Sequence, residues 1–138
     1  TFQGMMAHKF PNMFFTGFTQ AGANASNSKT FIDQGFHIGY VASEALKRGA
    51  VRVEPTAKAQ EDYIRRLRSV AVDNSDYVNE CTPSYFNNEG DTAKKRHIFG
   101  EPWGEGYYAF EDMLEKWRRK GDLAGLELRV ERELEPAE

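Results

Sequence analysis

Residues 10–20 read Phe-Pro-Asn-Met-Phe-Phe-Thr-Gly-Phe-Thr-Gln, a short apolar run that follows Pro11 and is interrupted by Gly17. A continuous apolar run of this length, bounded by glycine, is typical of a strand buried on both faces. We therefore predict a central strand at residues 12–18. Residues 19–27 carry only small or amide side chains, so their backbone can approach a bulky group closely.

Three further stretches have the periodicity of helices. In residues 28–48 the apolar and small side chains form one helical face, which consists of Phe31, Ile32, Gly35, Ile38, Gly39, Ala42, Ala45 and Leu46. Two glycines inside a helix lower its propensity, so we expect them to let this helix lie close to a strand or a ligand. A second helix is predicted at residues 56–72 with Thr56 as N-cap, and a third at residues 107–120, closed by Gly121.

The remaining chain supplies few strands. A short strand or hairpin is expected at residues 51–54 or 126–130, where apolar and charged residues alternate. Residues 73–106 form a long irregular stretch, and the acidic residues 131–138 are expected to fray. The fold class is therefore α/β in the sense of mixed α and β, and helix-rich.

Composition excludes several classes of protein. The 138 residues are 40% hydrophobic and carry a formal net charge of -3, so no chain-wide basic field exists to attract nucleic acid. No apolar run approaches the roughly 18 to 20 residues that span a bilayer, and the first residues lack a secretory signal. A single cysteine agrees with a reducing compartment, and we expect a cytoplasmic protein.

No self-contained catalytic or metal site is evident. The three histidines are far apart in sequence, and Cys81 has no CxxC partner, so we expect no metal. Cys81 could act as a nucleophile with His37 or His97, but an incidental or buried cysteine is the more common case. A strand, a small-residue loop and a helix can bind an anion or a polar cofactor edge, although composition alone favours an ordinary turn.

The order of the residues carries more information than their spacing. Residues 10–20 precede an Asn-containing loop and a helix with Asp33-Gln34 and His37-Ile38; later come ECTPSYFNNEG (80–90), GEPWG (100–104), and Trp117-Arg118 with Gly121-Asp122-Leu123. In this order they resemble the C-terminal part of flavin-dependent Baeyer-Villiger monooxygenases, in the subgroup that acts on ketones and steroid-like substrates. The resemblance covers nearly the whole chain.

The resemblance implies a fold and an activity. It implies a helix-rich C-terminal fragment of a flavoprotein with two dinucleotide-binding domains, whose fingerprints this chain lacks. Residues 1–50 would end the FAD-binding domain, and residues 51–138 would form a C-terminal helical and lid segment. The implied cofactors are FAD and NADP. The implied reaction inserts one oxygen atom of O2 beside a ketone carbonyl to give an ester or lactone, and the chain alone is expected to be inactive.

The resemblance also implies site residues. The segment that approaches the flavin ring would contain Thr16, Gly17, Phe18, Thr19 and Gln20, with an amide contact from Asn24 or Asn27. A mobile loop at residues 83–90 would fold over the nicotinamide cofactor, with Tyr85 or Phe86 at the place where the family often has a tryptophan. An aromatic ring that simply packs into the lid explains that position equally well.

Two alternatives remain beside a monooxygenase fragment. One is a non-enzymatic docking or oligomerisation module derived from such an enzyme, because an apolar strand without neighbours makes an isolated module associate with itself or with a partner. The other is a small flavin- or nucleotide-binding protein that completes its site by self-association. The expected partners are otherwise the missing N-terminal dinucleotide-binding domains and a ketone substrate.

Overall fold

The computed structural model describes residues 1–72, 80, 82–83, 89–91 and 102–130. Its elements in chain order are α1 (Asn27–Lys47), β1 (Ala50–Pro55), α2 (Ala57–Ser69), α4 (Tyr107–Lys120) and β2 (Leu126–Val130). The prediction of a mixed α and β, helix-rich fold is confirmed. The predicted helix at residues 107–120 has the observed bounds of α4, while α1 and α2 differ from the prediction by one to three residues at their ends.

Helix ends follow the capping residues of the sequence. The Thr56 hydroxyl accepts a hydrogen bond from the Ala59 amide at 3.1 Å, which confirms Thr56 as the N-cap of α2. α4 ends at Gly121, whose φ of 69° is the left-handed conformation that glycine adopts without strain. The guanidinium of Arg48, at the end of α1, donates to the Gly121 carbonyl, so the C-terminal ends of α1 and α4 are tied together.

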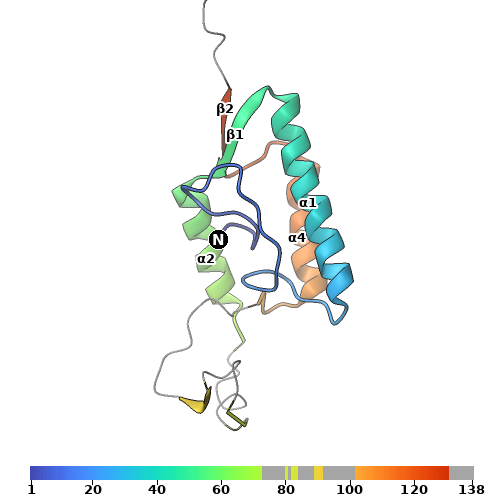
Figure 1. Ribbon diagram of the computed structural model, residues 1–138, viewed down its shortest axis with the longest axis vertical. Helices are drawn as coiled ribbons and strands as arrows, with labels where there is room; N and C mark the ends of the chain where they lie inside the picture. Colours follow the sequence, from blue (N-terminus) through green and yellow to red (C-terminus); the bar gives the residue numbers. More distant parts are fainter. Residues whose placement is uncertain (73–79, 81, 84–88, 92–101, 131–138) are drawn as a thin grey trace, which may run out of the picture.

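β1 and β2 form a two-stranded antiparallel sheet in which Val53 lies opposite Leu128 and Pro55 opposite Leu126. The two predicted strand positions are therefore both occupied, and they pair with each other. The sheet lies beside the C-terminal end of α1 and above α2 in the view of Figure 1. It joins the connection between α1 and α2 to the residues that follow α4.

The predicted strand at residues 12–18 is wrong, since these residues are turn, bend and irregular backbone outside any strand. Asn12 instead clamps the free edge of β1: its Nδ2 donates to the Val51 carbonyl and its Oδ1 accepts from the Val53 amide, both at 2.9 Å. Met13 is 48% exposed. A strand apolar on both faces needs paired neighbours, and the two described strands, β1 and β2, pair only with each other.

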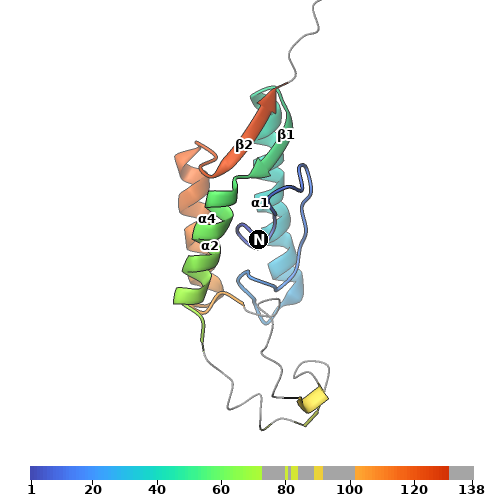
Figure 2. The same cartoon turned by 90° about the vertical axis from the view of Figure 1, so that its left-hand side faces the viewer.

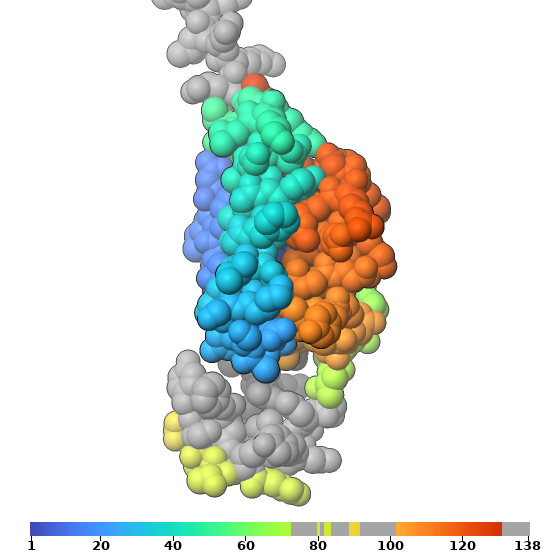
Figure 3. Space-filling model, turned by 90° about the vertical axis from the view of Figure 1, so that its right-hand side faces the viewer, coloured from blue at the N-terminus to red at the C-terminus, as the bar shows by residue number. Residues whose placement is uncertain are grey.

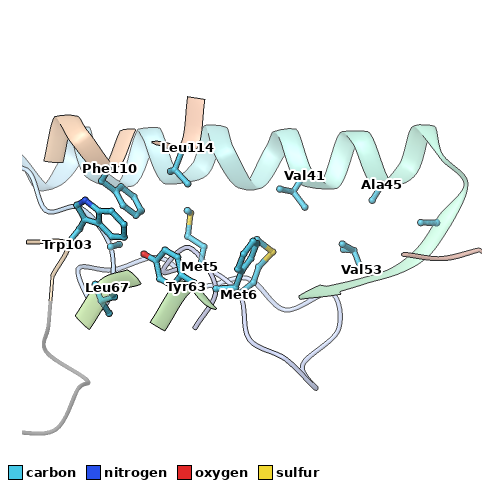
Figure 4. Close-up of a cluster of buried hydrophobic side chains, with 13 residues drawn as sticks. Met5, Met6, Val41, Ala45, Val53, Tyr63, Leu67, Trp103, Phe110 and Leu114 are labelled. Atoms are coloured by element: carbon cyan, nitrogen blue, oxygen red, sulfur yellow. The ribbon is translucent and has the colours of Figure 1, made fainter. Parts of the chain in front are cut away.

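The hydrophobic core lies between α2 on one side and α1 with α4 on the other (Figures 1 and 2). The N-terminal segment runs into this space and buries Phe2, Met5 and Met6 there. Figure 4 shows Met5 and Met6 beside Tyr63 of α2. Because these three side chains fill the space between the helices, the first six residues are an integral part of the core.

The inward side of α1 is not its apolar face. Its buried residues are Thr30, Gln34, His37, Val41 and Ala45. We define the outer face of α1 by six exposed residues, which are Phe31, Ile32, Gly35, Phe36, Gly39 and Leu46. The apolar face that the periodicity indicated is therefore largely directed outward. A Cβ placed on either glycine would meet no described atom within 4 Å, so the expected close approach is not made by the described residues.

Substitution of one buried and one exposed leucine tests where the hydrophobic core lies. Leu67 of α2 is fully buried, whereas Leu46 on the outer face of α1 is 73% exposed. We expect Leu67→Ala to lower the free energy of unfolding by about 2–5 kcal/mol, because it removes buried apolar atoms and leaves a cavity. The matched control Leu46→Ala should change it by less than about 0.5 kcal/mol. Urea unfolding of both variants measures the difference, and equal losses would contradict this description of the core.

Candidate functional site

The candidate site is the segment that leads into α1, residues 16–27. It is held against α1 by three contacts. The backbone N–H of Asn24 donates to the Thr30 hydroxyl at 3.1 Å, and the backbone N–H of Gly17 donates to the Gln34 side-chain oxygen at 2.9 Å. The ring centroid of Phe18 lies 5.6 Å from that of Phe31. The segment therefore follows the first two turns of α1.

The segment divides into an inner and an outer part. In the inner part, Gln20 and Ala21 are buried, and a Cβ on Gly22 would come within 2.7 Å of Phe110 in α4. The bulky group that these small residues approach is thus an aromatic ring of the core. In the outer part, Thr16 and Thr19 are exposed and Phe18 is 38% exposed, so this part is the accessible one.

The predicted site residues differ in what their side chains contact. The Gln20 side-chain oxygen accepts from the Thr1 hydroxyl at 2.6 Å, so this side chain is turned inward to Thr1. The Asn24 amide oxygen accepts from the Ser26 amide at 2.8 Å and shapes the turn before α1. Asn27 is exposed, as the first residue of α1. Tyr85 lies outside the described residues.

The outer part offers backbone donors. The amides of Phe18 and Thr19 donate no hydrogen bond to any of the residues that the structure describes. The carbonyl oxygens and ring nitrogens of a flavin accept hydrogen bonds, and backbone amides near a helix start favour negative charge. The exposed Thr16 has an open amide as well. Open donors on an exposed turn beside the first turns of α1 therefore fit the polar edge of a flavin. The assignment of residues 16–20 to a flavin contact remains a prediction.

A buried polar network behind this segment was missed by the sequence reasoning. The Nδ1 of His37 lies 3.0 Å from the Arg118 guanidinium, and its Nε2 lies 3.0 Å from the Gln3 amide oxygen. Since arginine only donates, Nδ1 must be the acceptor, so Nε2 carries the proton and donates to Gln3. The network joins α1, α4 and the N-terminal segment. Its sequence signal is that polar residues 30, 34 and 37 recur every three or four positions.

This environment sets the protonation state of His37. Its ring is fully buried, and burial lowers its pKa from 6.5 to about 3, with the positive charge of Arg118 as the second cause. The histidine is therefore neutral at physiological pH. A neutral ring can accept from Arg118 and donate to Gln3 at the same time, and an imidazolium could only donate.

A groove of about 620 Å³ lies between α2 and α4, away from this segment. It is lined by Trp103, Met113 and Trp117 among others. Four of its charged side chains form two ion pairs with each other: Arg66 pairs with Glu105 at 2.8 Å, and Lys116 pairs with Asp112 at 2.6 Å. The groove thus presents mostly aromatic and apolar surface. No group of three or more His, Cys, Asp or Glu side chains that could hold a metal occurs within the described part of the chain.

Known proteins resemble this chain over nearly its full length. An FAD-binding monooxygenase of Hypomyces subiculosus is 35% identical over 129 residues, covering 92% of this chain and 21% of that protein. The solved polycyclic ketone monooxygenase of the thermophilic fungus Thermothelomyces thermophila superimposes with a TM-score of 0.79 at 26% identity, over 94% of this chain and 21% of that one. No family model matches the chain.

A more distant structure shares the fold alone. An oxidised steroid monooxygenase bound to NADP superimposes with a TM-score of 0.65 at 16% identity, over 95% of this chain and 23% of its own. The chain spans about a fifth of the length of the curated relatives it matches. Together, these similarities confirm the resemblance to the C-terminal part of flavin-dependent monooxygenases. No described helix is long and apolar enough to cross a membrane.

His37 makes the stability of the chain depend on pH. The pKa of His37 in the folded state lies below the unfolded value of 6.5. Between these two pKa values, the ring is protonated in the unfolded state and neutral in the folded state. The stability contributed by the neutral ring is present above pH 6.5 and is lost as the pH falls from 6.5 towards 3, by at most about 1.4 kcal/mol per pH unit.

We therefore expect His37→Gln to be less stable than the wild type at pH 7 but to lose less stability between pH 6.5 and 4. Urea unfolding at several pH values measures this slope. The control His8→Gln removes a half-exposed histidine outside the network. A slope reduced equally by both substitutions would show that the buried ring has no special part in the pH dependence.

Proposed function

We propose that this chain is the C-terminal part of an FAD- and NADPH-dependent Baeyer-Villiger monooxygenase, which inserts one oxygen atom of O2 next to a ketone carbonyl. The observation that carries the proposal is the match of 92–95% of the chain to about a fifth of FAD-binding and ketone monooxygenases. A ketone substrate follows from the same similarity. The chain by itself is inactive, since it lacks the fingerprints that bind the two dinucleotides.

In this proposal residues 16–20 face the flavin. Bound FAD, reduced by NADPH, supplies the oxygen chemistry, and the protein supplies binding and orientation. The chain's own contribution is the pair of open amides at Phe18 and Thr19, which donate to the polar edge of the ring and favour its negative charge when reduced. Residues 1–50 then end the FAD-binding domain, residues 51–138 form the helical and lid segment, and Tyr85 lies over the nicotinamide.

The outer face of α1 is the docking surface for the dinucleotide-binding domains. Figure 3 shows α1 along the whole length of one side of the molecule, beside α4. Ile32 and Phe36 are each 67% exposed there, and the two glycines leave room for a close neighbour. Several large apolar side chains on one exposed helix face are typical of an interaction surface. The single cysteine favours a reducing compartment, and we extend the proposal to the cytoplasm.

The same face supports a second candidate, a non-enzymatic module that docks or self-associates through α1. Light scattering distinguishes the two cases. A module of this kind forms a defined oligomer without any flavoprotein, whereas the monooxygenase part forms no defined oligomer by itself.

The main proposal predicts the behaviour of the complete reading frame that carries this chain. We expect its product to bind FAD and to consume NADPH faster when a ketone is present. With ¹⁸O2, mass spectrometry should find one labelled oxygen atom in the ester or lactone. The isolated 138 residues should show none of this activity. A reading frame without dinucleotide-binding sequences, or a purified product without flavin, would refute the proposal.

A charged substitution on the outer face of α1 tests whether the dinucleotide-binding domains pack against this face. We expect Ile32→Glu to leave the unfolding free energy of the isolated chain within about 0.5 kcal/mol, because the side chain is solvated there. In the complete polypeptide it should lower the FAD content, since the interface would bury an unpaired carboxylate. FAD absorbance per polypeptide measures the loss. The control Val51→Glu adds the same charge at a half-exposed position of β1 and should retain flavin.

A further inference from the structure

The Gln34 side chain makes two hydrogen bonds to the backbone of Gly17, in the pattern of a neighbouring β-strand. The Gln34 amide oxygen accepts from the Gly17 N–H at 2.9 Å, and the Gln34 amide nitrogen donates to the Gly17 carbonyl at 2.6 Å. In an antiparallel sheet one residue receives this pair of bonds from the backbone opposite. Gly17 has no such backbone neighbour among the described residues, and the Gln34 side-chain amide takes its place.

The anchor itself is rigid. Gln34 is 1% exposed on the inward side of α1, and both polar groups of its amide are used by Gly17. One turn further along, His37 ties α1 to Gln3 and Arg118. Glutamine can make both bonds because its amide carries a donor and an acceptor, whereas glutamate lacks the N–H groups and leucine lacks both functions.

Holding the Gly17 carbonyl fixes the next amide. The Gly17 carbonyl and the Phe18 N–H belong to one planar trans peptide, in which the two groups point in opposite directions. Since the carbonyl points at Gln34 on the buried side of α1, the Phe18 N–H points away from Gln34. The Phe18 N–H donates to none of the described residues. Without the anchor, the peptide could rotate and the donor would lose its direction.

We propose that Gln34 is a positioning residue that holds the Gly17–Phe18 peptide so that its N–H faces the flavin of the monooxygenase. The inference rests on the proposed function for the identity of the acceptor. The anchor itself rests only on the contacts of Gly17 and Gln34. Gln34 does not touch the reacting groups; it acts through the backbone of the segment that does.

The test uses the complete flavoprotein and compares Gln34→Leu with His37→Leu. Both substitutions remove hydrogen bonds from the buried side of α1, three residues apart, but only Gln34 contacts Gly17. For Gln34→Leu we expect amide hydrogen exchange in residues 17–18, followed by mass spectrometry, to be at least tenfold faster. We expect the flavin to favour its reduced form about tenfold less, a midpoint potential about 30 mV lower for two electrons. His37→Leu should leave the potential unchanged.

A second variant covers the case in which Gln34→Leu does not fold. Gln34→Glu keeps the acceptor for the Gly17 N–H and loses the donor to its carbonyl, so Gly17 should stay protected while the potential falls. An unchanged potential in the folded Gln34 variants, or an equal shift in His37→Leu, overturns the inference while flavin binding by the wild type leaves the proposed function intact. A wild type without flavin overturns the proposed function, whereas the exchange rate of Gly17 still reports on the anchor.

Discussion

The structure depends on a buried polar stripe along α1 that must find hydrogen-bond partners. Buried polar groups cost free energy unless they are paired, and each member of this stripe is paired. Thr30 accepts from Asn24, Gln34 holds Gly17, and His37 bridges to α4. The stripe therefore decides where the segment before α1, the N-terminus and α4 are placed.

This arrangement leaves the apolar side of α1 facing outward. A helix with one polar and one apolar face ordinarily buries the apolar one. Here the polar face is inward because the segments around it offer matched donors and acceptors, while Ile32 and Phe36 stay exposed. An inverted helix of this kind is understandable if the outer face of α1 packs against a further part of the polypeptide, which agrees with relatives about five times as long.

Local rules predicted much of the fold correctly. The Thr56 cap, the closure of α4 at Gly121 and both short strands depend on neighbouring residues, so the sequence was sufficient. The strand at residues 12–18 failed because pairing is non-local: Asn12 instead binds the edge of β1 through its side chain. For the candidate site, the sequence indicated the right segment through its resemblance, but it did not indicate that Gln20 is turned inward to Thr1.

By itself, the sequence determined the helices, the Thr56 and Gly121 caps, the two short strands and the family resemblance, because these depend on short-range spacing or on residue order. Only the tertiary structure decided which side of α1 is buried, which residues replace the missing strand and which amides stay open. These properties depend on whether distant groups such as Gly17 and Gln34, or His37 and Arg118, meet with matched donors and acceptors. No local pattern contains that information.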